Sequence, residues 1–161
     1  MSRLRILEQS IVIEGIQRGN PGIPEVLHML ALIALKTNRA EDAVGHLESA
    51  VQSAPGSADL FGLLGGALEK AGRTEDAAKA FEQAITLEPG LADTHYNLGN
   101  ALKELGRLEE AEASYRNAIA LKPDFTQAHY NLGNALQELG RLEEAEANHR
   151  KAIELKPDYG L

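Results

Sequence analysis

A repeat of 34 residues is the feature that most constrains the fold of this 161-residue chain. Five of its six prolines are spaced 34 residues apart, at Pro21, Pro55, Pro89, Pro123 and Pro157. Blocks 92–125 and 126–159 are identical at 25 of 34 positions, and blocks 24–57 and 58–91 follow the same pattern. A period of this length indicates a repeat protein, in which each unit is one supersecondary element that packs against its neighbours.

Each block predicts two helices separated by a turn. In the last block, apolar residues recur with helical spacing in two runs, first at Leu132, Ala135, Leu136 and Leu139, then at Leu142, Ala145, Ile153 and Leu155. A glycine between the runs, at Gly72, Gly106 or Gly140, predicts a turn with a positive φ. Asp124 and Gln127 predict a capping pair that opens the first helix of the last block.

Small residues recur where two helices must approach closely. They form three columns: Gly65, Gly99 and Gly133; Ala43, Ala77, Ala111 and Ala145; and Ala50, Ala84, Ala118 and Ala152. We expect them to serve packing, because a small side chain lets two helix backbones come together without overlap.

The repeats resemble those of the tetratricopeptide repeat (TPR) family. The residues that carry the resemblance in the third block are Leu98, Gly99, Leu102, Gly106, Ala111, Tyr115, Ala118 and Pro123. The resemblance covers 24–159 and implies an all-α fold, a right-handed superhelix of antiparallel helix pairs whose first helices line a concave groove. The order expected is an N-terminal half-repeat or capping helix at 1–23, then TPR 1 at 24–57, TPR 2 at 58–91, TPR 3 at 92–125, TPR 4 at 126–159, and a C-terminal stub at 160–161.

The chain departs from the family pattern at a few positions. His95 and His129 stand where the family usually has tryptophan, and His149 replaces an aromatic residue in the last repeat. Asn38 replaces the turn glycine of the first repeat. We expect these departures to soften individual repeats and to leave the fold intact.

The resemblance also implies which residues face the groove. The candidates for binding a peptide or protein are Tyr96, Asn97, Asn100, Lys103, Glu104, Tyr130, Asn131, Asn134, Gln137, Glu138, Leu32 and Leu35. The side-chain amide of an asparagine offers both a donor and an acceptor, which matches a peptide backbone. The stacked asparagines are similar to the ladder of O-GlcNAc-transferase repeats, which hold extended polypeptides. The alternative interpretation is that these asparagines only cap or solvate their helices.

Composition and charge exclude several other classes of function. The formal net charge is −8, so nucleic acid is a poor partner, and the chain has no cysteine for a disulfide, a thiolate nucleophile or a thiolate metal site. The groove candidates place no Lys or Arg where the family's two-carboxylate clamp needs them, which favours a neutral or basic ligand over an acidic tail. No targeting or membrane-inserting segment is recognisable, and we expect a soluble, cytoplasmic protein.

No constellation for chemistry is evident. His95 and His129 are repeat equivalents without a complete ligand set, and the pairs Glu109–Glu110 and Glu143–Glu144 open second helices, where they complement the helix dipole. We therefore expect no enzyme activity, no cofactor and no metal.

Three hypotheses of function remain. The first is a non-catalytic interaction scaffold that holds an extended peptide or partner segment in its groove. The second is a self-assembling structural protein that forms a head-to-tail homo-oligomer or filament, because the chain opens with an apolar stretch (Leu4–Ile16) and stops at what resembles the start of another repeat. The third is the TPR front end of a glycosyltransferase-like enzyme. Fragmentation of a longer array and local folding back of the ends also remain open.

Overall fold

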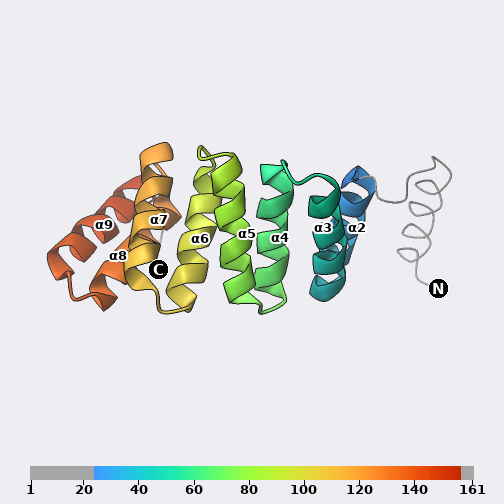
Figure 1. Cartoon of the computed structure of the whole chain (residues 1–161). Helices are drawn as coiled ribbons and strands as arrows, with labels where there is room; N and C mark the ends of the chain where they lie inside the picture. Colours follow the sequence, from blue (N-terminus) through green and yellow to red (C-terminus); the bar gives the residue numbers. More distant parts are fainter. Residues whose placement is uncertain (1–23, 157–161) are drawn as a thin grey trace. The chain divides into compact units, whose positions relative to one another are not determined.

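The computed structural model describes residues 24–156, which form eight α-helices and no strand (Figure 1). The predicted half-repeat at 1–23, Pro157 and the predicted stub at 160–161 lie outside the described residues. The chain divides into two compact units, unit 1 up to Leu87 and unit 2 from Glu88. No helix in the described part is long and apolar enough to cross a bilayer.

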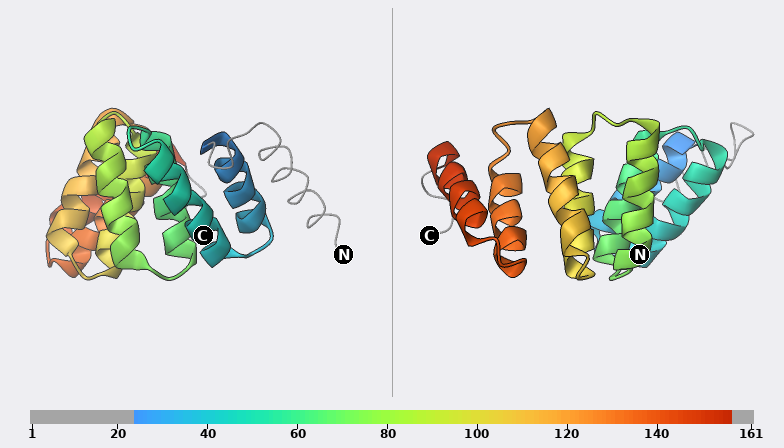
Figure 2. Two further views of the ribbon diagram at one scale, coloured as in Figure 1. Left: turned by 45° about the vertical axis from the view of Figure 1, so that its right-hand side comes forward. Right: turned by 60° about the vertical axis from the view of Figure 1, so that its left-hand side comes forward.

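Each unit contains two helix pairs. Unit 1 comprises α2 (Pro24–Lys36), α3 (Ala40–Ser53), α4 (Ala58–Lys70) and α5 (Thr74–Leu87), and unit 2 comprises α6 (Ala92–Glu104), α7 (Leu108–Leu121), α8 (Thr126–Glu138) and α9 (Leu142–Leu155). Consecutive helices within a unit pack against each other and run in opposite directions (Figure 2). In unit 2, α6 also contacts α8, so the two first helices are neighbours. The prediction of an all-α fold of antiparallel helix pairs is confirmed.

The turn inside each pair follows one pattern. Gly72, Gly106 and Gly140 have φ of 75°, 74° and 76°, and Asn38 takes the same role with φ of 57°. In the second repeat, the N–H of Gly72 donates to the Glu69 carbonyl and that of Arg73 to the Leu68 carbonyl, both at 2.9 Å. This is the Schellman ending of a helix, which satisfies its last carbonyl groups and requires a left-handed residue. The predicted turn glycines are confirmed.

The close-approach glycines lie under aromatic rings. A Cβ atom at Gly99 would come within 2.6 Å of the Tyr115 ring, and one at Gly133 within 2.7 Å of the His149 ring. Gly65 has the same relation to Phe81. The alanine columns are also buried, with no member more than 3% exposed. The predicted packing role of these small residues is confirmed, and His149 occupies the place of the aromatic residue that it replaces.

The predicted capping pair is wrong. Helix α8 starts after Phe125, which occupies the N-cap position, and no side chain caps it. Phe125 is instead buried beside Ala118 and Ala128, and its ring lies 4.9 Å from that of Tyr96. The burial of this ring fixes the start of the helix one residue later than the capping pattern indicates.

Candidate functional site

One surface of unit 2 gathers most of the predicted binding residues. We call it the first-helix face, because its members come from α6 and α8, with spacings of three, four and seven residues that place them on one side of each helix. Its members are Tyr96, Asn97, Asn100, Lys103, Glu104, Tyr130, Asn131, Asn134, Gln137 and Glu138.

A hydrogen-bond network connects three helices at this face. The Tyr115 hydroxyl, on α7, donates to Asn100 Oδ1 at 2.9 Å. The Asn131 amide nitrogen, on α8, donates to the same Asn100 oxygen at 2.8 Å and to the Tyr96 hydroxyl at 3.1 Å. Tyr115 is fully buried, whereas the two asparagines and Tyr96 are half-buried. Asn100 and Asn131 are therefore held by the protein and also reach its surface.

The other two asparagines of the face are arranged differently. Asn97 and Asn134 are half-buried, and within residues 24–156 their side chains make no hydrogen bond. Asn134 is the repeat equivalent of Asn100, but position 149 has a histidine where the third repeat has Tyr115. The four asparagines thus do not form four equivalent rungs: two belong to a network, and two are open to other partners.

The charged and aromatic members of the face also differ in environment. Lys103 Nζ lies 3.3 Å from Glu138 Oε1, an ion pair that joins α6 to α8. Glu104 and Gln137 are exposed. The Tyr130 ring is 36% exposed and lies edge-on to that of His149, with ring centroids 5.3 Å apart.

The two predicted apolar contacts belong to unit 1. Leu32 is 39% exposed on α2, and Leu35 is half-buried on the same helix. Met29, which the sequence interpretation did not single out, is 51% exposed on α2, and its position in the repeat is that of Asn97 and Asn131. An exposed methionine is a flexible apolar contact that suits binding surfaces.

Tyr115 is the functional candidate that sequence reasoning missed. Its position was assigned to packing alone, but its hydroxyl reaches the first-helix face from the interior. A signal was present in the repeats: the pairs at these two repeat positions are Leu32 with Leu47, Gly66 with Phe81, and Asn100 with Tyr115. A hydroxyl occurs there only opposite an asparagine.

The two candidate histidines bind backbone groups. His95 and His129 are at most 9% exposed, and the Nε2 atom of each lies 3.0 Å from a proline carbonyl, of Pro89 and Pro123 respectively. A carbonyl can only accept, so Nε2 carries the proton in both rings. In residues 24–156 no group of three or more His, Asp and Glu residues could hold a metal ion.

A cluster of ions joins α7 to α9 on the other side of unit 2. Both carboxylate oxygens of Glu112, which is 7% exposed, lie 2.7 Å from Arg141 Nη1, and Arg116 Nη1 is 2.8 Å from Glu112 Oε1. Arg141 also binds Glu144 at 2.7 and 2.8 Å, and these hydrogen bonds lower the pKa of Glu144. Arg107 likewise lowers the pKa of Glu110.

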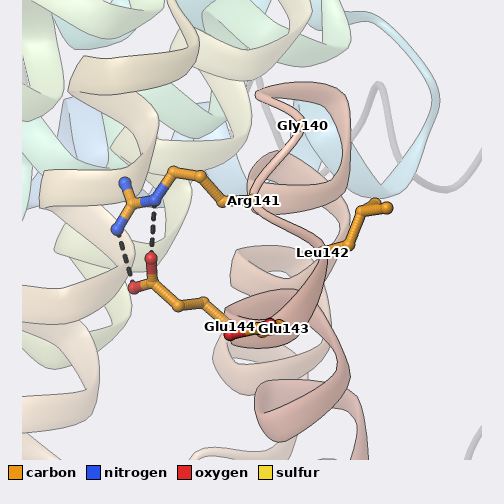
Figure 3. Close-up of a pocket in the computed structure, with 5 residues that line it drawn as sticks. All are labelled: Gly140, Arg141, Leu142, Glu143 and Glu144. Atoms are coloured by element: carbon orange, nitrogen blue, oxygen red, sulfur yellow. Dashed lines mark hydrogen bonds and ion pairs between the residues drawn. The ribbon is translucent and has the colours of Figure 1, made fainter.

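The surface hollow beside this cluster offers no free chemical group. Its lining is the turn and first helical turn at Gly140, Arg141, Leu142, Glu143 and Glu144 (Figure 3). The charge of Arg141 is already satisfied by Glu144 and Glu112, and Leu142 points away from it (Figure 3). The arrangement stabilises a helix interface and does not resemble a catalytic site.

Comparisons with known proteins agree with this architecture. Models of the tetratricopeptide repeat match residues 28–92, 80–113 and 126–159, and a TPR repeat model matches 99–140. No curated protein matches the chain.

Solved structures share the fold over most of their length. A crystal structure of MamA is 27% identical, with a TM-score of 0.84 over 89% of this chain and 84% of that one. Another MamA structure is 25% identical, with a TM-score of 0.82 over 100% and 98%. YrrB, described as a TPR protein with an unusual peptide-binding site, is 22% identical, with a TM-score of 0.79 over 86% and 71%.

The matched ranges run in sequence over 28–159, and the helix pairs, turn residues and close-approach glycines follow the 34-residue period throughout the described part. The chain is a member of the tetratricopeptide repeat family.

Proposed function

We propose that this chain is a non-catalytic interaction scaffold that binds an extended peptide, or an extended segment of a partner protein, along its first helices. One observation supports the proposal above others: four side-chain amides lie half-buried on the first-helix face, at Asn97, Asn100, Asn131 and Asn134. Such amides suit the N–H and C=O groups of an extended main chain and place few demands on its side chains.

The charge of the face favours a neutral or basic ligand. Glu104 is exposed, and Lys103 is paired with Glu138, so the face offers no unpaired cation for a carboxylate. The net charge of −8 adds a general attraction for basic segments. In unit 1, Leu32, Leu35 and Met29 are proposed contacts for apolar side chains of the ligand. YrrB resembles this chain only at the level of the fold, so the amides, rather than that likeness, support the choice of ligand.

The proposal is tested by selecting ligands from a display library of random 12-residue peptides and titrating the selected peptides. The double variant Asn100→Ala/Asn134→Ala should bind roughly tenfold more weakly than the wild-type chain, because each lost amide removes a hydrogen bond from the complex. Asn117→Ala, an exposed asparagine of α7 outside the face, is the matched control and should bind like the wild-type chain. Equal binding by all three proteins would remove the asparagines from the proposed site.

A second candidate function is head-to-tail self-assembly, which apolar exposure on α9 supports. Leu142 is 64% exposed and Ile153 54%, whereas their repeat equivalents Leu108 and Ile119 are half-buried. The ion pair of Glu146 with Arg150 also repeats that of Glu112 with Arg116, to which the fourth repeat adds Arg141. A second copy of the chain could present its Arg39 and Asp42, which occupy the positions of Arg141 and Glu144.

Light scattering over a concentration series tests self-assembly. The apparent mass should rise with concentration, and Leu142→Glu/Ile153→Glu should return it to that of a monomer. Leu121→Glu, which adds a charge at an exposed leucine of α7, is the control and should leave the assembly unchanged. A constant monomeric mass for the wild-type chain would exclude this function.

A further inference from the structure

The network around Asn100 gives the first-helix face a fixed hydrogen-bonding polarity. Asn100 Oδ1 accepts from Tyr115 on one side and from Asn131 on the other. An amide oxygen has two lone pairs, so both are used and the Asn100 NH₂ group is left as a donor. Asn131 uses both of its N–H bonds, toward Asn100 and Tyr96, and its Oδ1 is left as an acceptor.

We infer that these two groups form a docking site for one residue of an extended main chain, and that the buried Tyr115 is the positioning residue that sets its polarity. This inference rests on the proposed function and names the chemistry recognised: a main-chain carbonyl that accepts from the Asn100 amide, and a main-chain N–H that donates to Asn131 Oδ1. In an extended chain the N–H and C=O of one residue point to the same side, as in a β-ladder. One residue of the ligand therefore satisfies both groups.

Tyr115 acts only through Asn100. Its side chain is 0% exposed, so a ligand cannot touch it. Its ring covers Gly99 in the way that Phe81 covers Gly65, which indicates that phenylalanine fits this place in a repeat. Tyr115→Phe therefore removes the hydroxyl that holds the Asn100 oxygen and keeps the ring packing.

The third and fourth repeats provide a comparison within the same unit. Asn134 corresponds to Asn100, but neither a tyrosine hydroxyl nor an asparagine from a following repeat holds its amide within residues 24–156. Its amide is therefore free to turn, whereas that of Asn100 can turn only if Asn131 turns with it. Preorganised donors bind more tightly than ones that must be ordered by the ligand.

Replacing each amide by a carboxylate tests the polarity directly. Asn100→Asp keeps both inward acceptors and replaces the outward donor by an anion. The variant should therefore unfold at the wild-type temperature and bind a peptide selected from the 12-residue library at least about tenfold more weakly. Asn131→Asp places an acceptor against the Asn100 oxygen, so it should lower the unfolding temperature of the chain.

The controls separate position from charge. Asn117→Asp adds the same charge on the exposed side of α7 and should bind and unfold like the wild-type chain. Tyr115→Phe should weaken binding several-fold and broaden or shift the side-chain ¹⁵N–¹H₂ signals of Asn100 in an NMR spectrum. A purely structural role of the hydroxyl would change stability and leave those signals in place.

The outcomes distinguish this inference from the proposed function. If no selected peptide binds the wild-type chain, both fail. If peptides bind and Asn100→Asp binds as well as Asn117→Asp, only the docking site fails. If Asn100→Asp is the unstable variant and Asn131→Asp the stable one, the polarity is the reverse of the one inferred, and the inference is overturned.

Discussion

At the scale of single residues, the two adjacent glycines of α4 have opposite roles. A Cβ at Gly65 would overlap the Phe81 ring, whereas a Cβ at Gly66 meets nothing within 4 Å. Gly65→Ala should destabilise the chain by about 1–3 kcal/mol, because the ring or the helix must shift. Gly66→Ala should stabilise it by about 0.5–1 kcal/mol, because alanine loses less backbone freedom in a helix. Urea unfolding of both variants measures the difference.

The pair is its own control, since both substitutions add one methyl group to the same helix. Equal effects of the two variants would contradict the packing assigned to Phe81. The measurement should use the free energy of unfolding rather than the binding of a ligand, because Gly66 occupies the repeat position of Asn100.

The packing of these small residues could be predicted from the sequence, and the hydrogen bonds of the face could not. A glycine that recurs every 34 residues on a helix has few explanations other than close approach. The bond from Tyr115 to Asn100, however, depends on the distance between an interior ring and a surface amide on another helix. Helical periodicity placed each asparagine on a face but contained no information about its partner.

At the scale of helices, Arg141 joins the fourth repeat to the third. It holds the buried Glu112 of α7 together with Arg116, and it also binds Glu144 of α9. Arg141→Ala should cost about 1–3 kcal/mol of unfolding free energy, because Glu112 stays largely buried with one partner fewer. Thermal and urea unfolding measure this loss.

Arg150→Ala is the matched control for that loss. Arg150 pairs with Glu146 on the surface of α9, where both side chains are at least 69% exposed. Such pairs contribute about 0–1 kcal/mol, so the control should unfold close to the wild-type chain. A control as destabilised as Arg141→Ala would indicate a general effect of losing an arginine from the fourth repeat.

The same cluster predicts a dependence of stability on pH. Hydrogen bonds from Arg141 lower the pKa of Glu144 in the folded chain, with a further contribution from Arg116. The stability that this carboxylate contributes is therefore present above its unfolded pKa of about 4.3 and is lost as the pH falls through its lower folded pKa. Glu144→Gln should be less stable than the wild-type chain at pH 7 and lose less stability between pH 7 and pH 3.

Arg141→Ala checks the cause of this effect. The variant removes the strongest donor to Glu144, so its stability should also fall less steeply with acid than that of the wild-type chain. An unchanged acid dependence in both variants would show that the Glu144 pKa is not shifted by this arginine. Calorimetric melting temperatures at each pH provide the measurement.

The helix boundaries could be predicted better at their ends than at their starts. The turn glycines predict where each first helix stops, because only a left-handed residue closes it in this way. The start of α8 depends instead on the burial of Phe125 against Tyr96, a contact between helices that a local capping pattern does not contain. The role of Arg141 was missed for the same reason, since its partner Glu112 belongs to the preceding repeat.

At the scale of the molecule, nearest-neighbour packing predicts that the last helix is the least protected of unit 2. In repeat proteins each element is stabilised mainly by the elements beside it. Helix α9 buries only Ala145 and Ala152, whereas α7 buries Ala111, Glu112, Ser114, Tyr115 and Ala118. Hydrogen exchange should therefore be faster for the backbone amides of α9 than for those of α7.

That expectation has a built-in comparison, because the two helices are close in sequence and equal in length at 14 residues. Equal protection of α7 and α9 would mean that something covers the outer side of α9, and dilution would then show whether it is a second copy. The all-α repeat fold could be predicted from the 34-residue period alone. The division into two units could not, because the period is the same on both sides of Leu87.

The bond between Tyr115 and Asn100 also has a consequence for how such arrays diverge. A mutation that gave the second repeat an asparagine at Gly66 would find Phe81 beneath it, with no hydroxyl to steer the new amide. Recognition of a backbone at an additional repeat would then require two changes on two different helices. Gene duplication copies both residues at once, so lengthening the array is a shorter evolutionary route to a longer ligand than remodelling the repeats already present.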